Sequence, residues 1–94
     1  MDNIGIRNIA ELRDFGKSLQ QLGEQMYNMM IQAQNTLNVI SEGWHDDNNE
    51  LFRSHFEESL KQVNKMSEEF SDYNSYVQKI CDIADEYISN RPNM

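Results

Sequence analysis

Apolar residues in the first half of the chain recur at seven-residue intervals. One row contains Leu12, Leu19, Met26, Ala33 and Ile40, and a second row, three positions later, contains Phe15, Leu22 and Met29. Rows with this spacing share one side of an α-helix and are typical of packing against another helix. Met30 and Leu37 widen the stripe beyond the narrow seam of a two-stranded coil. The pattern predicts an amphipathic helix over about residues 5–41, starting between residues 4 and 9.

The second half of the chain repeats this pattern. One row contains Phe56, Val63, Phe70, Val77 and Ala84, and the other contains Phe52, Ser59, Met66, Tyr73, Ile80 and Tyr87. Charged and amide side chains fill most of the intervening positions, as expected of a solvated face. We predict a second helix over about residues 48–89. Residues 90–94 contain the only proline and are predicted to form a frayed tail.

The seven-residue rhythm stops between the two halves, where helix stop and start signals gather. Gly43 can adopt the left-handed conformation that ends many helices. Asp46 or Asp47 can cap the next helix, and Asn8 with Glu11 has the spacing of a capping box at the start of the first. These signals place a turn at about residues 42–47. The sequence therefore predicts one all-α domain over residues 1–94, an antiparallel helix-turn-helix hairpin.

The apolar stripes are too wide to be covered by one helix-helix contact. Met30, Leu37 and Ile83 are expected to stay exposed beside the seam of a lone hairpin, and a chain of 94 residues has little interior in which to bury them. A second chain that completes a four-helix bundle would cover them. The predicted dimer or bundle interface consists of Leu12, Phe15, Leu19, Leu22, Met26, Met29, Phe56, Val63 and Phe70.

Two glycines and the tryptophan each allow two interpretations. Gly16 and Gly23, seven residues apart beside the seam, either permit close approach of another helix or are tolerated at the surface at a cost of about 1 kcal/mol each relative to alanine. Trp44 either plugs the end of the hairpin against Ile40 and Phe52 or is exposed as an anchor for a partner.

The charge balance argues against several classes of partner. Sixteen acidic residues against eight basic ones give a net charge of −8, which opposes binding to nucleic acid or anionic lipid. No apolar run approaches the roughly 20 residues that span a bilayer, and the start lacks the pattern of a Sec signal peptide. Cys81 is the only cysteine, and its spacing with Val77 and Ala84 indicates a small buried hydrophobic residue.

The residues at the turn offer only a weak signal for chemistry. His45, Asp46, Asp47 and His55 can be imagined as metal ligands, but the EF-hand and HExxH patterns are absent. Capping and solvation explain these residues as well. Both histidines lie far along the helix from Cys81, so no nucleophile-base pair is indicated. We therefore expect no catalytic residue, metal or cofactor.

A hairpin of just under one hundred residues with a tryptophan at its turn resembles the WXG family, small helical proteins exported by bacterial type VII secretion systems. The resemblance spans nearly the whole chain. Trp44-His45-Asp46 stands where the family has Trp-x-Gly, so Trp44 carries over, whereas Asp46 replaces the glycine and can cap the second helix. The resemblance implies a noncatalytic protein that forms a homodimer or a heterodimer with a related helical protein, as a four-helix bundle.

The resemblance also implies how such a protein is exported. Many family members carry a carboxy-terminal Tyr-x-x-x-Asp/Glu signal that a membrane ATPase reads together with the partner's tryptophan. Here Tyr73, Tyr76 and Tyr87 are followed four residues later by Val77, Ile80 and Arg91. A partner would then supply the signal. The implied roles are a protein secreted without a Sec signal peptide, the targeting partner of a larger helical toxin, or, alternatively, a cytoplasmic helical adaptor that is not exported.

Overall fold

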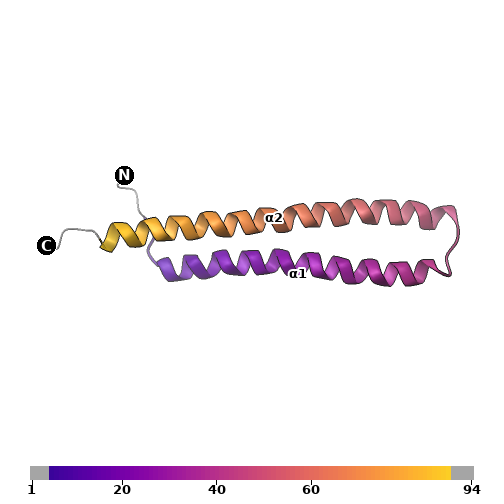
Figure 1. Cartoon of the computed structure of the whole chain (residues 1–94), viewed down its shortest axis with the longest axis horizontal. Coiled ribbons are helices and arrows are strands. Elements are labelled where there is room, and N and C mark those ends of the chain that lie inside the picture. Colours follow the sequence, from indigo (N-terminus) through magenta and orange to yellow (C-terminus); the bar gives the residue numbers. More distant parts are fainter. Residues whose placement is uncertain (1–4, 90–94) are drawn as a thin grey trace.

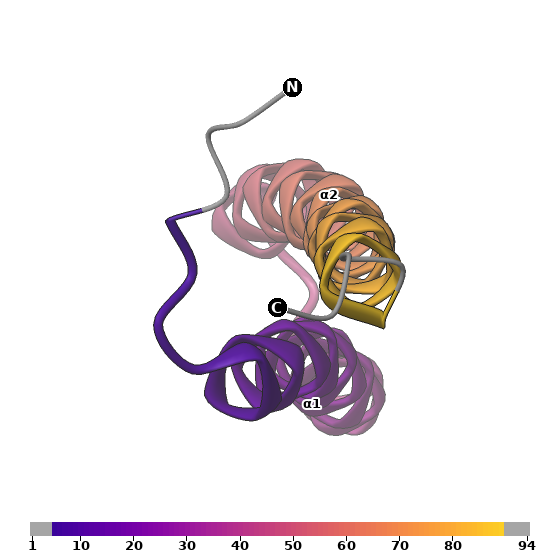
Figure 2. The same cartoon turned by 90° about the vertical axis from the view of Figure 1, so that its left-hand side faces the viewer.

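The computed structural model describes residues 5–89 and folds them into two long helices joined by a short turn (Figure 1). The helix α1 spans Ile9–Ser41 and the helix α2 spans Asp47–Ser89. They run antiparallel, and an end-on view shows a single layer of two helices (Figure 2). The molecule measures 75 × 19 × 14 Å. The predicted helical hairpin is confirmed, and its core is confined to the strip between the two helices.

The first helix begins later than residue 5, at the end of the predicted range of starting positions. Asn8 has an extended backbone (φ −136°, ψ 98°), and its side chain accepts a hydrogen bond of 3.0 Å from the backbone N–H of Glu11. This interaction satisfies one of the free N–H groups at the helix start and fixes the boundary at Ile9. The predicted tail, residues 90–94, lies outside the described residues.

The turn differs from the prediction in how α1 ends. The backbone N–H groups of Glu42, Gly43 and Trp44 donate to carbonyls three residues earlier, at 3.1–3.3 Å. These tight bonds satisfy the last carbonyls without a left-handed residue. The expectation that Gly43 would adopt the left-handed conformation is wrong, since no described glycine has a positive φ. At the start of α2, the Asp46 carboxylate accepts from the N–H of Asn49 at 3.0 Å, which confirms Asp46 as a cap.

The two helices approach most closely at the glycines of α1. Gly16 and Gly23 are both buried. A Cβ atom on Gly23 would lie 3.0 Å from the Cα of Ser67 and 3.2 Å from the Cβ of Phe70. Such contacts are tighter than ordinary van der Waals contact, so a side chain here would push against α2, and the glycines permit the observed helix separation. Of the two interpretations, close helix approach is confirmed, and it occurs within the hairpin itself.

This close approach rotates α1 relative to the predicted seam. Leu37 is only 8% exposed and Met30 is half-buried, because both continue the line of Gly16 and Gly23 at seven-residue spacing. The expectation that Met30 and Leu37 would stay exposed is therefore wrong. The expectation that Ile83 would stay exposed is confirmed, since its side chain is 49% exposed.

The opposite helix contributes the two most deeply buried hydrophobic side chains, Cys81 and Ala84. Both are fully inaccessible to solvent, and the Cys81 Sγ lies 3.8 Å from the carbonyl oxygen of Ile9. The interpretation of Cys81 as a small buried hydrophobic residue is confirmed. Ahead of them, Phe56, Val63, Phe70 and Val77 are half-buried against α1, as the first predicted row of α2 requires.

Candidate functional site

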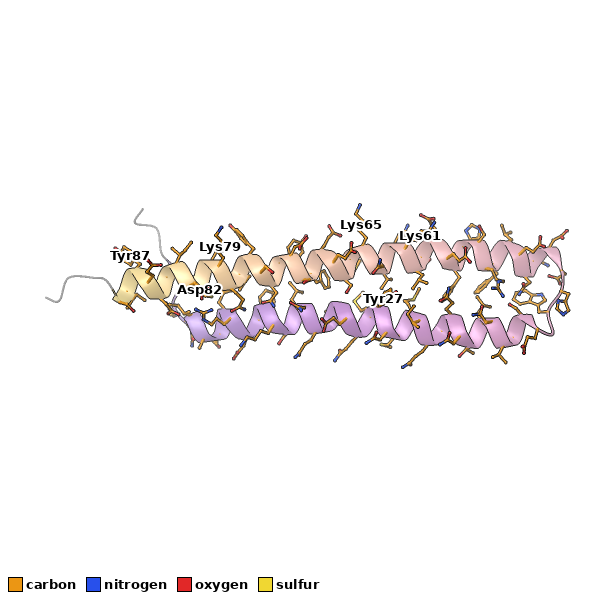
Figure 3. The ribbon with its side chains drawn as sticks, in the orientation of Figure 1. Tyr27, Lys61, Lys65, Lys79, Asp82 and Tyr87 are labelled. Atoms are coloured by element: carbon orange, nitrogen blue, oxygen red, sulfur yellow. The ribbon has the colours of Figure 1, made fainter. Side chains whose placement is uncertain are left out.

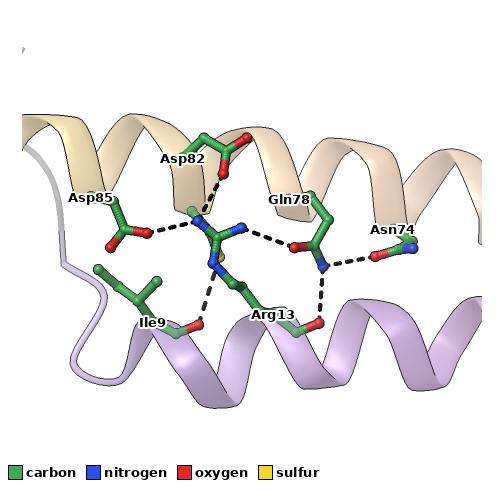
Figure 4. Close-up of polar contacts among 7 residues, drawn as sticks. Ile9, Arg13, Asn74, Gln78, Asp82 and Asp85 are labelled. Carbon is green, nitrogen blue, oxygen red and sulfur yellow. Dashed lines mark hydrogen bonds and ion pairs between the residues drawn. The ribbon is translucent and has the colours of Figure 1, made fainter.

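One broad side of the hairpin is polar and is held by hydrogen bonds between the helices. At the open end, the Arg13 guanidinium donates to Asp82 and Asp85 at 2.7 Å each and to Gln78 at 3.0 Å (Figure 4). The hydrogen bonds to Asp85 and Asp82 raise the pKa of Arg13 above its usual value. The cluster fastens the first turns of α1 to the last turns of α2.

Further polar pairs continue along the same side. Gln78 donates to the Arg13 carbonyl and to the Asn74 side chain, both at 2.9 Å (Figure 4). Asn74 in turn donates to Gln20 at 2.7 Å. Closer to the turn, Arg53 donates to Asn38 at 3.1 Å. We call this side the polar face; it consists of Arg13, Gln20, Asn38, Arg53, Asn74 and Gln78.

The opposite side of the layer can be located from residues that face the other helix. Val77 points at Gly16, whose Cβ position lies 3.0 Å from the Val77 Cγ1 atom. Successive residues of a helix are rotated by about 100°, so Gln78 and Tyr76 flank Val77 on opposite sides. By the same rule Phe15 lies on the side of α1 away from Arg13. Because Arg13 and Gln78 are bonded on the polar face, Phe15 and Tyr76 lie together on the opposite side.

That opposite side exposes a band of large apolar side chains, which we call the apolar face. It consists of Phe15, Leu22 and Met29 on α1, and Phe52, Met66, Tyr73, Tyr76, Ile83 and Tyr87 on α2. Their exposed fractions run from 38% to 66%. On α1 no charged residue lies between Glu24 and Glu42. Large apolar side chains exposed together along one side of a fold mark an interaction site.

The predicted interface residues fall into two sets, one buried between the helices and one exposed on the apolar face. Leu12, Leu19, Met26, Phe56, Val63 and Phe70 are half-buried in the contact between α1 and α2, whereas Phe15, Leu22 and Met29 are exposed. The contact of either set with a second chain stays a prediction. Sequence reasoning missed Tyr76, whose signal was its seven-residue spacing from Ile83, in a row whose earlier member Glu69 is charged.

Trp44 closes the turn end of the hairpin. Its ring centroid lies 6.1 Å from that of Phe52, at an interplanar angle of 47°, and the side chain is half-buried. The packing of Trp44 against Phe52 is confirmed, while Ile40 is 54% exposed. Beside it, the buried Asn49 donates to the Ser41 hydroxyl at 2.8 Å and ties the two helices together. The turn is thus a fixed element that presents part of an indole ring.

The acidic and histidine side chains at the turn lie around a shallow hollow. It is lined by Trp44, His45, Asp46, Asp47, Asn49 and Glu50. Within residues 5–89, no group of three or more histidine, cysteine or acidic side chains is arranged to hold a metal ion. Over the same residues, neither helix is apolar enough along its length to cross a membrane.

Comparison of the chain with known protein families, with curated proteins and with solved structures finds no match. The apolar face and the turn around Trp44 are therefore the features on which a functional proposal rests.

Proposed function

We propose that this chain is a noncatalytic, WXG-like helical-hairpin protein that works by binding a second helical chain, as a type VII secretion substrate or as the targeting partner of a secreted helical toxin. The observation that carries the proposal is the apolar face on a single-layer hairpin with Trp44 at its turn. A single layer has no other element with which to cover that face.

A second pair of helices is the simplest cover for such a surface. Antiparallel hairpins stack face to face as four-helix bundles, in which both apolar faces become core. Full burial of one large apolar side chain contributes about 1.5–3 kcal/mol, so several exposed residues of the size of Phe15 and Leu22 provide the driving force for association. The partner is a second copy or a related helical protein.

The geometry of the turn supports the family resemblance despite the altered motif. Asp46 acts as the cap of α2, and aspartate and glycine are both accepted at capping positions. Asp46 can therefore cap α2 at the position where the family has glycine. Trp44 keeps part of its ring exposed next to this cap, where a secretion ATPase or a partner can contact it.

An intracellular helical adaptor or structural subunit that is never exported is the second candidate. It is favoured by the residues that follow Tyr73, Tyr76 and Tyr87, none of which completes a Tyr-x-x-x-Asp/Glu signal. The two candidates use the same apolar face. They differ in where the protein is found.

Export is tested by following the chain in bacteria that encode it together with a type VII secretion system. We expect it in the culture medium, and we expect its loss from the medium when the secretion ATPase is deleted. A chain that stays in the cells, with and without the ATPase, contradicts export and supports the adaptor.

A variant of Trp44 separates recognition from packing. Trp44→Ala is expected to keep its helical circular dichroism, because Asn49, Ser41 and the Asp46 cap still hold the turn, while secretion or partner binding is lost. His45→Ala, at the exposed neighbouring position, serves as the control and should leave both unchanged. Global unfolding of Trp44→Ala would show that the ring serves mainly to pack the turn.

A further inference from the structure

We propose that the apolar face binds a second copy of this chain in one antiparallel register, and that a row of alternating charges on α2 selects this register. The row consists of Glu58, Lys65, Asp72 and Lys79, and Glu86 continues it at the same spacing, opposite the partner's Leu51 in this register. The inference rests on the proposed function, because it names the partner of the same surface. It adds a reason why that partner is a second copy.

The charged row lies along the outer edge of the apolar face. Its members are seven residues apart, so they line up along one side of α2, next to the row that contains Tyr76 and Ile83. All four are exposed, and within residues 5–89 the ion pairs are those of Arg13. Lys65 and Lys79 point away from α1 (Figure 3). Positions that flank an apolar seam are those from which charged side chains reach across to a neighbouring helix.

The sign of the charges makes the row complementary to itself when it is reversed. Along α2 the signs run negative, positive, negative, positive. In an antiparallel pair of α2 helices, Glu58 therefore faces the partner's Lys79, and Lys65 faces the partner's Asp72. A parallel pair in register would place like charges side by side. The two-fold axis of the antiparallel pair lies midway between Lys65 and Asp72.

The exposed residues of α1 indicate the same axis independently. Phe15, Leu22 and Met29 form a row centred on Leu22. Antiparallel self-pairing about Leu22 sets this residue against its own copy and Phe15 against the partner's Met29. Gly23, the next residue, packs against Ser67 and Phe70, so Leu22 and the midpoint of the charged row lie at one level of the hairpin. One two-fold axis therefore serves both helices.

Shifted registers lose favourable pairs on at least one of the two helices, either the charge pairs of α2 or the apolar pairs of α1. A slide by one heptad sets Lys65 against the partner's Lys79. A slide by two heptads restores opposite charges but moves the axis to the level of Gly16, which packs against Asn74 and Val77. Leu22 would then face the partner's Asn8, a polar residue, in place of an apolar side chain. Of these three registers, the central one is that in which both the charges and the apolar residues find partners.

Charge exchange tests the register through the dimer dissociation constant, measured by sedimentation of the full chain. Lys65→Glu creates two like-charge contacts per dimer, opposite each copy of Asp72, and is expected to weaken the dimer about tenfold. Asp72→Lys should weaken it similarly. The double variant Lys65→Glu with Asp72→Lys restores opposite charges and should return the dissociation constant to within about threefold of the original.

A matched pair of residues one turn earlier provides the control. Lys61 and Glu68 have the same signs and spacing as Lys65 and Asp72, but their rotation of about 40° turns them toward the polar-face side. Lys61→Glu changes the net charge equally and should weaken the dimer much less. Equal effects of Lys65→Glu and Lys61→Glu, or no recovery in the double variant, would overturn the register.

Thiol cross-linking locates the axis directly in a Cys81→Ala background. Leu22→Cys should be joined to its own copy by a short bifunctional thiol reagent, and Phe15→Cys should react with Met29→Cys in a mixture of the two variants but not with itself. Failure of the Leu22 link in a proven dimer overturns the axis. A chain that sediments as a monomer throughout the micromolar range overturns self-association, yet leaves the proposed binding of a different helical chain intact.

Discussion

At the scale of single residues, the spacing of the two helices is decided by positions that have no side chain. Gly16 and Gly23 let the backbones approach, and the neighbouring large residues of α1 are turned outward as a result. A glycine inside a helix lowers helix stability by about 1 kcal/mol relative to alanine. At these two positions that loss accompanies the close contact between the helices.

Replacement of Gly23 tests this balance. Gly23→Ala gains helix propensity, but its methyl group meets the Ser67 backbone and the Phe70 side chain at 3.0–3.2 Å, and backbone atoms can yield only if α2 moves. We expect a net loss of about 1 kcal/mol in the free energy of unfolding, measured by urea denaturation. Asn28→Ala, exposed on the same helix, should be neutral or stabilising. If Gly23→Ala raises the free energy of unfolding as much as Asn28→Ala does, the helices are not in close contact at Gly23.

The cap of α2 gives a second prediction for one residue. Asp46→Ala removes the acceptor of the Asn49 N–H and should lower the free energy of unfolding by about 1 kcal/mol, whereas Asp46→Asn should be nearly neutral. Asp46→Gly, which creates the family's Trp-x-Gly motif, should cost only a few tenths of a kcal/mol. Thermal melts of the three variants measure the order. A large loss for Asp46→Gly would mean that the two turns are not equivalent.

At the scale of the helices, Arg13 fastens the open end, where the hairpin has no covalent connection. Arg13→Gln removes the bonds to Asp82 and Asp85 and should speed amide hydrogen exchange in the last turns of α2, with no change near the turn. Lys17→Gln, which removes the same charge one turn later from an exposed site, should leave the exchange rates unchanged. If the last turns of α2 exchange their amide hydrogens equally slowly in Arg13→Gln and in the original chain, apolar packing alone holds the open end of the hairpin.

The helices were predictable because long, regular heptads leave few alternatives, and the caps at Asn8 and Asp46 follow from local spacing. The orientation of α1 was not. A wide apolar stripe predicts packing against another helix but not which of its edges makes the contact, and glycines at the true contact gave no hydrophobic signal. The Arg13 cluster joins residues far apart in the chain, so no local pattern reveals it.

At the scale of the whole molecule, charge is distributed unevenly over the hairpin. The net charge of −8 opposes self-association, yet Met29 lies within a stretch without charge between Glu24 and Glu42, and Leu22 lies close to its start. Repulsion between two copies therefore comes mainly from α2 and from the polar face. A dimer can form if the contacts across the apolar face exceed this repulsion, and one acidic residue on that face makes the balance measurable.

Glu69 is that residue, and the proposed register brings it close to its own copy. It lies in the heptad row of Tyr76 and Ile83, next to the two-fold axis between Lys65 and Asp72. Two carboxylates that approach each other in a partly buried contact repel, so Glu69→Gln is expected to lower the dimer dissociation constant several-fold.

The neighbouring Glu68 provides the control for this prediction, since Glu68→Gln removes the same charge from a position turned away from the apolar face. Sedimentation at low ionic strength should separate the two variants, and added salt should narrow the difference because it screens the repulsion. If Glu69→Gln leaves the dimer unchanged or weakens it, Glu69 does not lie beside its copy, and the two-fold axis must pass through another level of the hairpin.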